Sequence, residues 1–521
     1  MAAVIWIVII AALAVAFKFL AYPYVRRQLE SSTGSESQYR SELSLAADSF
    51  SGYCIFRSEP FKKQLKARGI KLTIVNDQAD YEARAKALLK GDTQMAVFSL
   101  DSLIKTGAML GEFPATIVMA IDETKGADAI IAHKGAVASI EDLNSPDARI
   151  VFTPNSPSEF LSRIVLAHFS LPNLPEKWWV HADGAADVYK MFKAAKPGEK
   201  KAYALWEPYV SKALEEQDAV VLLDSSRLKG YVVDVLVAQR EFLSKHPEQV
   251  REVMETYFRT AFAVGRQKDG LVNLVRDDAA ETGAERLDAK LAEKIIQGIQ
   301  WKNTLENYAH FGLLSGKEAA GLRHLEDMIT NVTDVLVKTG ALARDPLAGK
   351  ANVLFYDKIL REMRAQGFHP GKALNILDNA GLGADVASAA DLGPIQAEKE
   401  LPKLSDKQWD SLAAVGTLNV KPISFARGTA RLNVNSRREL DQLAEHLRSW
   451  PTYYLIVVGH ARAEGDAAAN VELAAKRAEA AAEYLASRGI GEGRVKPKAA
   501  TPSGSEGEFQ SVSFLVGQLP Y

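Results

Sequence analysis

The stretch LLKGDTQMAVFSLDSL, at residues 88–103, joins the end of an amphipathic helical segment to a short β-type run. The helical segment is YEARAKALLK at 81–90, and the β-type run is TQMAVFSL at 93–100. Alternation of such segments is typical of α/β units, whose strands pair in a largely parallel sheet. The stretch therefore predicts an α/β fold for the part of the chain around it.

The same alternation begins at about residue 49 and extends in both directions from this stretch. Further β-type runs are GIKLTIV, ATIVMAI, ADAIIAH, ARIVFT and KAYALW, at 69–75, 115–121, 127–133, 148–153 and 201–206. From about 241 to 370 the pattern becomes mostly helical, as in LDAKLAEKIIQGIQ at 287–300. We expect two α/β lobes, with the helical part completing or covering the first lobe.

Length and composition indicate a multi-domain protein of ordinary globular type. The chain has 521 residues, and a single hydrophobic core stops growing at roughly 250 to 300 residues. Its 63 Lys and Arg residues nearly balance its 65 Asp and Glu residues, so the charge gives no indication of a nucleic-acid partner. One cysteine, Cys54, excludes an internal disulfide and a cysteine-based metal site.

The N-terminus has the pattern of a membrane anchor. Residues 2–17 read AAVIWIVIIAALAVAF, and KFLAYPYV extends the run to about the 20 residues that a spanning helix needs, if Lys18 reaches the interface. The alternative is a cleaved signal peptide, but a basic start and an A-x-A site are lacking. We predict a transmembrane anchor at 1–25 and a polar stalk at 26–48. Arg26 and Arg27 alone favour a cytoplasmic location for the bulk of the chain.

A second change of composition separates a C-terminal domain from the α/β part. Residues 371–410 accumulate Gly, Ala, Pro and Asp without an apolar face, which predicts a linker. Residues 411–521 then give a strand KPISFA, a helix at 435–450, a strand YYLIVVGHA, a helix at 470–489, the segment RVKPKAA and a final strand SVSFLVG. This order predicts an α+β sandwich with helices on one face of a sheet.

Seven segments of the larger part match one protein family in order and spacing. They are FSGYCIF, LLKGDTQMAVFSLDSL, KGADAIIAHKGAVASIEDLNS, VFTPNSPSEFL, YALWEPYVSKALEE, FLSKHPEQVREVMETYFRTAFAV and IQWKNTLENYAHFGLL. On these, residues 49–370 resemble the periplasmic solute-binding proteins of the nitrate, sulfonate and thiamine-precursor type of ABC importers. The resemblance implies a type II fold with two lobes that close about a hinge on a small solute.

In the second lobe, candidate solute contacts follow from helix starts and strand ends. The loop from Thr153 leads into Ser156, Pro157, Ser158 and Glu159, which predict a capping box that opens a helix. Its amides could face an anion or a carbonyl in the cleft, although capping boxes also open helices without any ligand. The family position of this loop favours Thr153, Ser156 and Ser158 as contacts.

Further candidates come from the positions that the family uses at its cleft. In WEPY, Trp206 could stack on the solute or pack beneath the hinge, and Glu207 would favour a cation, a hydrogen-bond donor or a metal. The matching candidates in the first lobe are Gly52, Tyr53, Ser99 and Asp101. Asp128, at the hinge crossing, either braces the hinge or contacts the solute.

No catalytic constellation stands out in the sequence. The nine histidines show no H-E-x-x-H spacing, and neither a G-x-S-x-G elbow nor a glycine-rich phosphate loop after a strand is present. We therefore expect a binding protein with no cofactor and no resident metal.

The C-terminal part carries the pattern of a second family. ISFARGTARLNVNSRRELDQLAEHL at 423–447 precedes IVVGHARAEGDAAANVELAAKRAEAAAEYLASRGI at 456–490. Residues 421–521 thus resemble the OmpA C-terminal domain, shared with peptidoglycan-associated lipoproteins and flagellar stator B subunits. The matching positions are Gly459, His460, Gly465, Asn470, Leu473, Arg477 and Ala478.

One charge departs from the pattern of that family. The resemblance implies that arginine and aspartate grip the carboxylate and the ammonium of the diaminopimelate residue in peptidoglycan. Arg477 keeps the first role, whereas Arg462 stands where the aspartate is expected. At 4 Å and an effective dielectric constant of about 20, the lost attraction is roughly 4 kcal/mol. Gln510 and Ser511 also replace a basic pair, so we expect a preserved fold with a degraded wall site, used for altered peptidoglycan binding or for partner contacts.

Taken together, the two resemblances imply a single-pass inner-membrane receptor with its bulk in the periplasm. The expected partners are a small solute, an inner-membrane protein and peptidoglycan, with no nucleic acid; oligomer formation through the helix or the OmpA-like domain stays open. The alternative is a stator-like B subunit or a scaffold that has lost ligand binding. A stator subunit relays protons through an aspartate in its helix, and residues 2–25 contain none.

Overall fold

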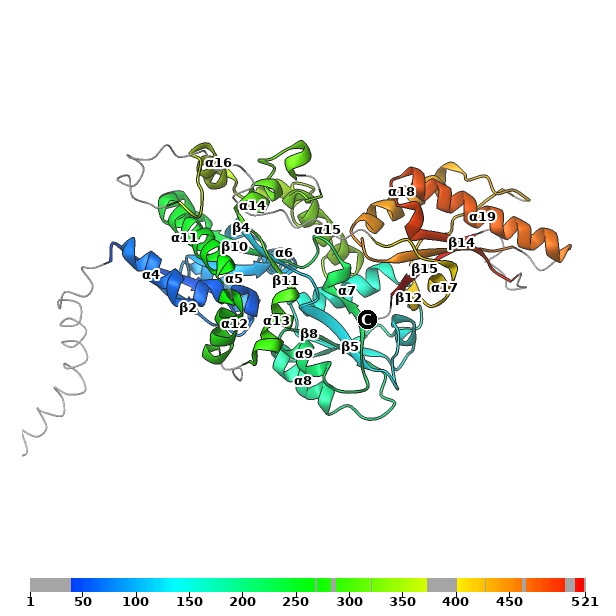
Figure 1. Cartoon of the computed structure of the whole chain (residues 1–521), viewed down its shortest axis with the longest axis horizontal. Coiled ribbons are helices and arrows are strands. Elements are labelled where there is room, and N and C mark those ends of the chain that lie inside the picture. The colour runs from blue at the N-terminus through cyan, green and yellow to red at the C-terminus, as the bar shows by residue number, and fades with distance from the viewer. Residues whose placement is uncertain are drawn as a thin grey trace, which may run out of the picture.

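The computed structural model describes residues 39–267, 269–282, 287–319, 321–372, 401–426, 428–461, 465–501 and 511–519. A two-lobed α/β domain is followed by a smaller α+β domain (Figure 1). The predicted anchor at 1–25 and most of the predicted stalk lie outside the described residues. Within the ranges above, no helix combines the length and the apolar character that a membrane crossing needs.

The first lobe is built on a six-stranded sheet in the order β11-β4-β10-β3-β1-β2. Its strands are β1 (Ser41–Ala46), β2 (Ile70–Val75), β3 (Met95–Ser99), β4 (Ala115–Thr124), β10 (Val233–Gln239) and β11 (Ile299–Trp301). The pairs β1/β2 and β1/β3 are parallel, whereas β10 is antiparallel to both β3 and β4, and β11 is antiparallel to β4. The sheet is mixed because β10 brings the chain back from the second lobe.

The second lobe holds a five-stranded sheet in the order β7-β6-β8-β5-β9. Its strands are β5 (Asp128–His133), β6 (Arg149–Phe152), β7 (Trp179–His181), β8 (Lys201–Trp206) and β9 (Ala219–Asp224). The pairs β6/β7 and β6/β8 are parallel, and β5 is antiparallel to both β8 and β9. The prediction of a largely parallel sheet is therefore wrong for both lobes, because each sheet also contains a strand that leaves or re-enters its lobe.

Amphipathic helices cover the two sheets. The first lobe has η3 (Ser51–Tyr53), α3 (Cys54–Arg57), α4 (Glu59–Ala67), α5 (Tyr81–Lys90) and α6 (Leu100–Leu110). The second has η4 (Ile140–Leu143), α7 (Pro157–His168), α8 (Gly184–Lys193) and α9 (Tyr209–Ala213). The helical part is η5 (Ser225–Arg227), α10 (Arg240–Lys245), α11 (Pro247–Arg266), α12 (Gly270–Glu281), α13 (Ala289–Gln297), α14 (Thr304–His310), η6 (Gly316–Ala319), α15 (Leu325–Lys338), η7 (Ala351–Leu354) and α16 (Lys358–Ala365). Helix α15 contacts both α6 and α7, so it links the lobes.

Two chain segments cross between the lobes and form a hinge. The first, at 125–127, joins β4 to β5, and the second, at 225–232, joins β9 to β10. They are held together by Gly126, whose amide donates to Ser225 Oγ at 2.8 Å, and by Lys125, whose Nζ donates to the Leu228 carbonyl at 3.0 Å. Paired crossings of this kind are the usual basis of hinge closure.

The two-lobed domain begins earlier than the sequence pattern suggested. Residues 41–46, which we expected in the stalk, form β1 between β2 and β3. The boundary at 49 is therefore wrong. Leu43 and Leu45 are buried in the sheet, and this short alternation of apolar residues is the signal that marks the strand.

The smaller domain has a four-stranded sheet in the order β12-β15-β13-β14, with two long helices on one face (Figure 1). Its elements are α17 (Asp406–Asp410), β12 (Ala413–Thr417), α18 (Val434–Arg448), β13 (Tyr454–Gly459), α19 (Ala467–Ser487), η9 (Glu492–Arg494), β14 (Val495–Ala499) and β15 (Val512–Gln518). The α+β prediction is confirmed. KPISFA is not a strand, however: of its residues, Phe425 makes an isolated bridge to Leu432, and β12 supplies the edge strand. Helix α17 lies in the predicted linker, and its Trp409 packs edge-on against Tyr454.

The two domains pack directly on each other. The Ser170 amide donates to the Thr417 carbonyl at 2.9 Å, next to a bridge between Phe169 and Leu418. The Trp450 ring stacks on Phe169 with centroids 5.7 Å apart. At the hinge, the Lys229 amide donates to the Ser449 carbonyl at 2.8 Å. The smaller domain therefore contacts both the second lobe and the returning hinge segment.

Candidate functional site

A cleft of about 650 Å³ lies between the two lobes. The first lobe contributes Asp48, Ser49 and residues 76–82, which follow β1 and β2 and open α5. The second contributes 153–155 after β6, 182–186 at the start of α8, and Trp206 at the end of β8. Strand ends and helix starts meet at this cleft, which is where open α/β sheets bind ligands.

A small inner chamber adjoins the cleft. It is lined by two carboxylates and four aromatic rings, from Asp48, Phe50, Tyr53, Tyr81, Asp128 and Trp206. Its volume of about 10 Å³ leaves room for about one water molecule. Asp128 and Trp206 come from the second lobe and the others from the first, so the chamber changes width whenever the lobes move.

The candidates of the first lobe lie at or just behind the chamber. Tyr53 lines it, and Gly52 lies behind it: a Cβ at Gly52 would come within 2.6 Å of Asp122 Oδ2 and 2.4 Å of the Phe50 ring. Ser99 is fully buried, and its Oγ lies 2.6 Å from Ser102 Oγ. Neither Ser99 nor Asp101 is among the residues that line the chamber. Asp101 Oδ1 is buried and has no hydrogen-bond partner in the described structure.

The loop before α7 supplies one cleft residue and several buried ones. Thr153 lines the cleft, and its Oγ1 is buried without a hydrogen-bond partner. Ser156 and Ser158 are fully buried. Helix α7 begins at Pro157 as predicted, but the predicted capping box is wrong: the Ser156 hydroxyl donates to the Thr153 carbonyl at 2.6 Å.

Glu159, the carboxylate of the predicted capping box, makes other contacts. Glu159 Oε2 accepts a hydrogen bond from the Asn155 amide at 2.7 Å, instead of from Ser156. It also pairs with Arg163 of its own helix and with Lys105 of α6 in the first lobe, at 2.7 and 2.5 Å. Glu159 therefore bridges the lobes.

The two residues of the WEPY segment have different surroundings. Trp206 lines both the cleft and the chamber. Glu207 is buried and accepts from the Ser211 amide at 3.0 Å and the Ser211 hydroxyl at 2.7 Å. It is not among the residues that line either cavity, so its geometry favours a role in fixing the start of α9.

Burial raises the pKa of several carboxyl groups around the hinge. Burial raises the pKa of Asp101 and Asp128 to about 7 and that of Asp122 to about 8. Asp234 lies opposite Asp122 on the neighbouring strand, and burial together with repulsion from Asp122 raises its pKa as well. Asp128 also experiences repulsion from Asp101, Glu207 and Asp48.

The buried cations near the cleft already have carboxylate partners. Arg84 pairs with Asp48 at 3.1 Å and also with Asp77. Arg57, whose side chain is buried, pairs with Asp278 at 2.5 Å. Lys302 and Lys125 pair with Glu123 at 2.9 and 2.8 Å, below the hinge. The positive charges thus stabilise the fold and do not point into the cleft as free groups.

Sequence reasoning missed three residues that shape the chamber: Asp48, Phe50 and Tyr81. Asp48 fell in the predicted stalk, and the signal that could have found it is the end of the β1 alternation immediately before it. Tyr81 opens α5, and its ring carries the Arg84 guanidinium at 4.6 Å.

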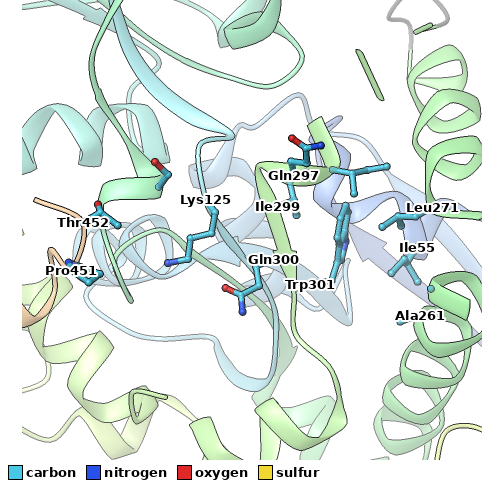
Figure 2. A pocket seen from close by; sticks show the side chains of 13 residues that line it. Ile55, Lys125, Ala261, Leu271, Gln297, Ile299, Gln300, Trp301, Pro451 and Thr452 are labelled. Atoms are coloured by element: carbon cyan, nitrogen blue, oxygen red, sulfur yellow. The ribbon is translucent and has the colours of Figure 1, made fainter. Parts of the chain in front are cut away.

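Another cavity, of about 730 Å³, adjoins the hinge at Lys125 (Figure 2). Its lining combines Trp301, Ile299 and Gln300 of the β11 strand with Lys125 of the hinge and with Pro451 and Thr452 of the smaller domain. Ala261 and Leu271 close its other end. Because these residues come from the hinge, from β11 and from the smaller domain, a hinge motion would change the shape of this cavity.

In the smaller domain, the predicted wall-site residues are divided between described and undescribed segments. Arg477 is buried: its Nη1 donates to the His460 carbonyl at 3.0 Å and its Nε to the Thr429 carbonyl at 3.1 Å. Asn470 lies in the first turn of α19. Arg462 and Gln510 lie outside the described residues, so the charge reversal stays a prediction.

In the segments that the structure describes, no three His, Cys, Asp or Glu side chains are grouped so that they could hold a metal ion.

Two α/β lobes joined by paired crossings, with a cleft at strand ends, make up a fold that can close about a hinge. Residues 424–506 match the model of the OmpA family. The peptidoglycan-associated lipoprotein of Rhizobium meliloti is 33% identical over 81 residues, which are 15% of this chain and 46% of that protein. A second, from Agrobacterium fabrum, matches equally. The chain thus spans about half the length of the curated relatives it matches.

Solved structures similar to the two-lobed part include the alkanesulfonate-binding protein SsuA from Xanthomonas axonopodis pv. citri, bound to MOPS. It is 17% identical with a TM-score of 0.46, and the alignment covers 60% of this chain and 98% of that one. SsuA from Escherichia coli is 16% identical with a TM-score of 0.44, covering 62% and 99%. The desulfurization enzyme DSZB is 11% identical with a TM-score of 0.42, covering 63% and 99%. At these identities the likeness concerns the fold alone.

Proposed function

We propose that this protein is a receptor that binds a small solute between its two lobes and contacts the cell envelope through its OmpA-family domain. The observation that carries the proposal is the cleft itself, which is lined from both lobes at strand ends and helix starts. Its polar wall includes the unpartnered Thr153 Oγ1, a group that a bound solute would satisfy.

The proposal includes attachment to the inner membrane through residues 1–25, with the bulk of the chain in the periplasm. Its support is the apolar run of the sequence together with the kinds of domain that follow it. An inner-membrane protein would receive the solute or respond to lobe closure. Protease accessibility in spheroplasts tests this location: cleavage of the domains only after the inner membrane is broken would contradict it.

A thermal-shift screen of the full chain tests solute binding. The panel contains small anions, amino acids, pyrimidines and organic amines. A ligand present at 100 times its dissociation constant should stabilise the folded protein by about 2.7 kcal/mol. If no member of the panel raises the melting temperature, the receptor function is contradicted.

Two variants on one helix make the screen specific for the cleft. Ala186→Trp places a bulky ring in the cleft wall near the start of α8, whereas Ala194→Trp places the same ring on the exposed end of that helix. The first variant should lose the ligand-induced shift and the second should keep it. Equal shifts for both would place binding elsewhere.

We propose that the OmpA-family domain binds ordinary peptidoglycan weakly and serves chiefly in contacts with other envelope proteins. Arg477, the residue expected to grip a stem-peptide carboxylate, is engaged with two backbone carbonyls. A muropeptide pull-down comparing the native chain with Arg462→Asp tests the proposal. The variant should bind more tightly, and native binding as strong as that of the variant contradicts a degraded site.

A further inference from the structure

We infer that the solute carries an ammonium group, which lodges in the inner chamber between Asp128 and the aromatic rings. The inference rests on the proposed receptor function and names the chemical class of its ligand: a small organic amine or quaternary ammonium compound. Four independent features of the cleft and of the inner chamber support this inference.

The first feature is the charge of the cleft. Its described lining contains the carboxylates Asp48, Asp77, Asp80, Glu82 and Asp183 but no Lys, Arg or His. A cleft lined by charges of one sign concentrates the field between its walls and attracts solutes of the opposite sign. This lining opposes a sulfonate or a phosphate and favours a cation.

The second feature is the aromatic wall of the chamber. Phe50, Tyr53 and Tyr81 come from the first lobe and Trp206 from the second. Phe50 and Tyr53 meet edge to face, with ring centroids 5.2 Å apart, which fixes the wall. Aromatic rings attract cations, most strongly where water is excluded, and rings grouped around a cavity are a recurrent way of binding quaternary ammonium groups.

The third feature is a carboxylate without a cation. Asp48 in the chamber is matched by Arg84 and receives hydrogen bonds from the Phe50 amide and the Tyr81 hydroxyl, at 3.0 and 3.4 Å. Asp128 across from it is 2% exposed, and no salt bridge joins it to another described residue. The charged groups that act on it most are the carboxylates Asp101, Glu207 and Asp48. An ammonium group beside Asp128 would supply the missing counter-charge.

The fourth feature is Thr153. The residue is 6% exposed and lines the cleft, and its buried hydroxyl has no hydrogen-bond partner in the described structure. It lies at the end of β6 in the second lobe, on the same side of the cleft as Trp206. A solute whose ammonium group occupies the chamber and whose remainder extends into the cleft would pair with this hydroxyl.

The chamber must widen to admit an ammonium group, so binding requires the lobes to move. At about 10 Å³ the chamber is smaller than an ammonium group with methyl substituents. Asp128 and Trp206 belong to the second lobe, whereas the three remaining aromatic rings belong to the first lobe. A small opening at the hinge would therefore widen the chamber. Closure around the cation then brings the rings into contact with it.

The test compares two solutes of one shape. Choline and its neutral isostere 3,3-dimethyl-1-butanol differ in whether nitrogen or carbon stands at the branched centre. We expect choline or ethylammonium to raise the melting temperature of the full chain at constant ionic strength, and the neutral isostere and sodium methanesulfonate to leave it unchanged. Stabilisation by methanesulfonate or by the isostere equal to that by choline would overturn the inference.

Two variants locate the binding. Asp128→Asn removes the charge and Trp206→Leu removes a ring of the chamber, and each should weaken cation binding by about tenfold or more in isothermal titration. The matched controls are Glu306→Gln, a buried carboxylate of the first lobe, and Trp179→Leu, a ring of the second lobe, neither of which lines a cavity. Unchanged affinity in Asp128→Asn overturns the inference even if the protein binds cations.

The outcome also separates the inference from the proposed function. If amino acids, pyrimidines or anions stabilise the chain while ammonium compounds do not, the receptor function stands and the ammonium class is wrong. If no solute of the wider panel stabilises it, both are wrong.

Discussion

Replacing Asp128 with Asn should stabilise the protein, and the gain should grow with pH. Asp128 is 2% exposed, and burial raises the pKa of its carboxyl from 3.8 to about 7. Each pKa unit corresponds to about 1.36 kcal/mol of preference for one protonation state. Above pH 7 the ionised side chain therefore costs the folded state an amount that approaches about 4 kcal/mol, which the neutral amide avoids.

The direction of the pH dependence follows from proton binding. The unfolded carboxyl loses its proton near pH 4, whereas the folded one keeps it up to about pH 7. Between these values the folded state binds more protons, so the free energy of unfolding falls as pH rises and then levels off. At low pH both states of Asp128 are neutral, and the advantage of the variant should disappear.

Guanidinium unfolding of the full chain, followed by tryptophan fluorescence at about pH 4.5, 6 and 8, measures the effect. The exposed Glu241→Gln, whose carboxylate pairs with Lys245, serves as the control and should leave the profile close to that of the native protein. A variant that is less stable than the native protein at pH 8, or a difference that does not change with pH, would refute the reasoning. The cost of Asp128 to stability is the kind of cost that binding sites retain.

Three further predictions concern packing and the domain interface. Gly52→Ala should destabilise the first lobe by about 1–3 kcal/mol, because its Cβ meets the Phe50 ring and Asp122, and a melting temperature equal to that of the native chain would contradict this. Trp450→Ala should cost about 3–5 kcal/mol and expose the junction between the domains to limited proteolysis, whereas Tyr484→Ala, remote from the junction, should not expose it. Acidification should loosen the same junction: burial together with the nearby His446 and Lys338 lowers the pKa of His168, so the unfolded state takes up the proton and stability is lost below about pH 6.5. His168→Leu should flatten that acid limb in a urea titration, and an unchanged limb would contradict the assignment.

The OmpA-family domain packs against the hinge. Lys229 in the returning hinge segment bonds to Ser449, and Arg227 lies over the Tyr453 ring at 6.0 Å. A change in hinge angle on solute binding would shift these contacts directly.

The sequence by itself determined the kinds of element and their order. Local patterns decide where strands and helices form, because the side-chain period of each element is written along the chain. The α/β alternation, the start of α7 at Pro157 and the α+β order of the smaller domain follow from such patterns. Tyr53, Thr153 and Trp206, which line cavities, were candidates through the resemblance to a family and not through periodicity. Short alternations at the edge of a composition change, such as β1, were lost against the polar surroundings of the stalk.

Only the tertiary structure decided which side chains meet. Asp48 and Asp128 are 80 positions apart and face one chamber because β1 of the first lobe ends there and β5 of the second lobe begins there. The capping residue Ser156 turned instead to Thr153, and Glu159 joined Lys105 of the other lobe, since a long-range ion pair competes with a local hydrogen bond. The raised pKa values likewise come from burial among distant carboxylates, which no window of the sequence contains. Residue types are local information, whereas their neighbours in space depend on how two lobes fold against each other.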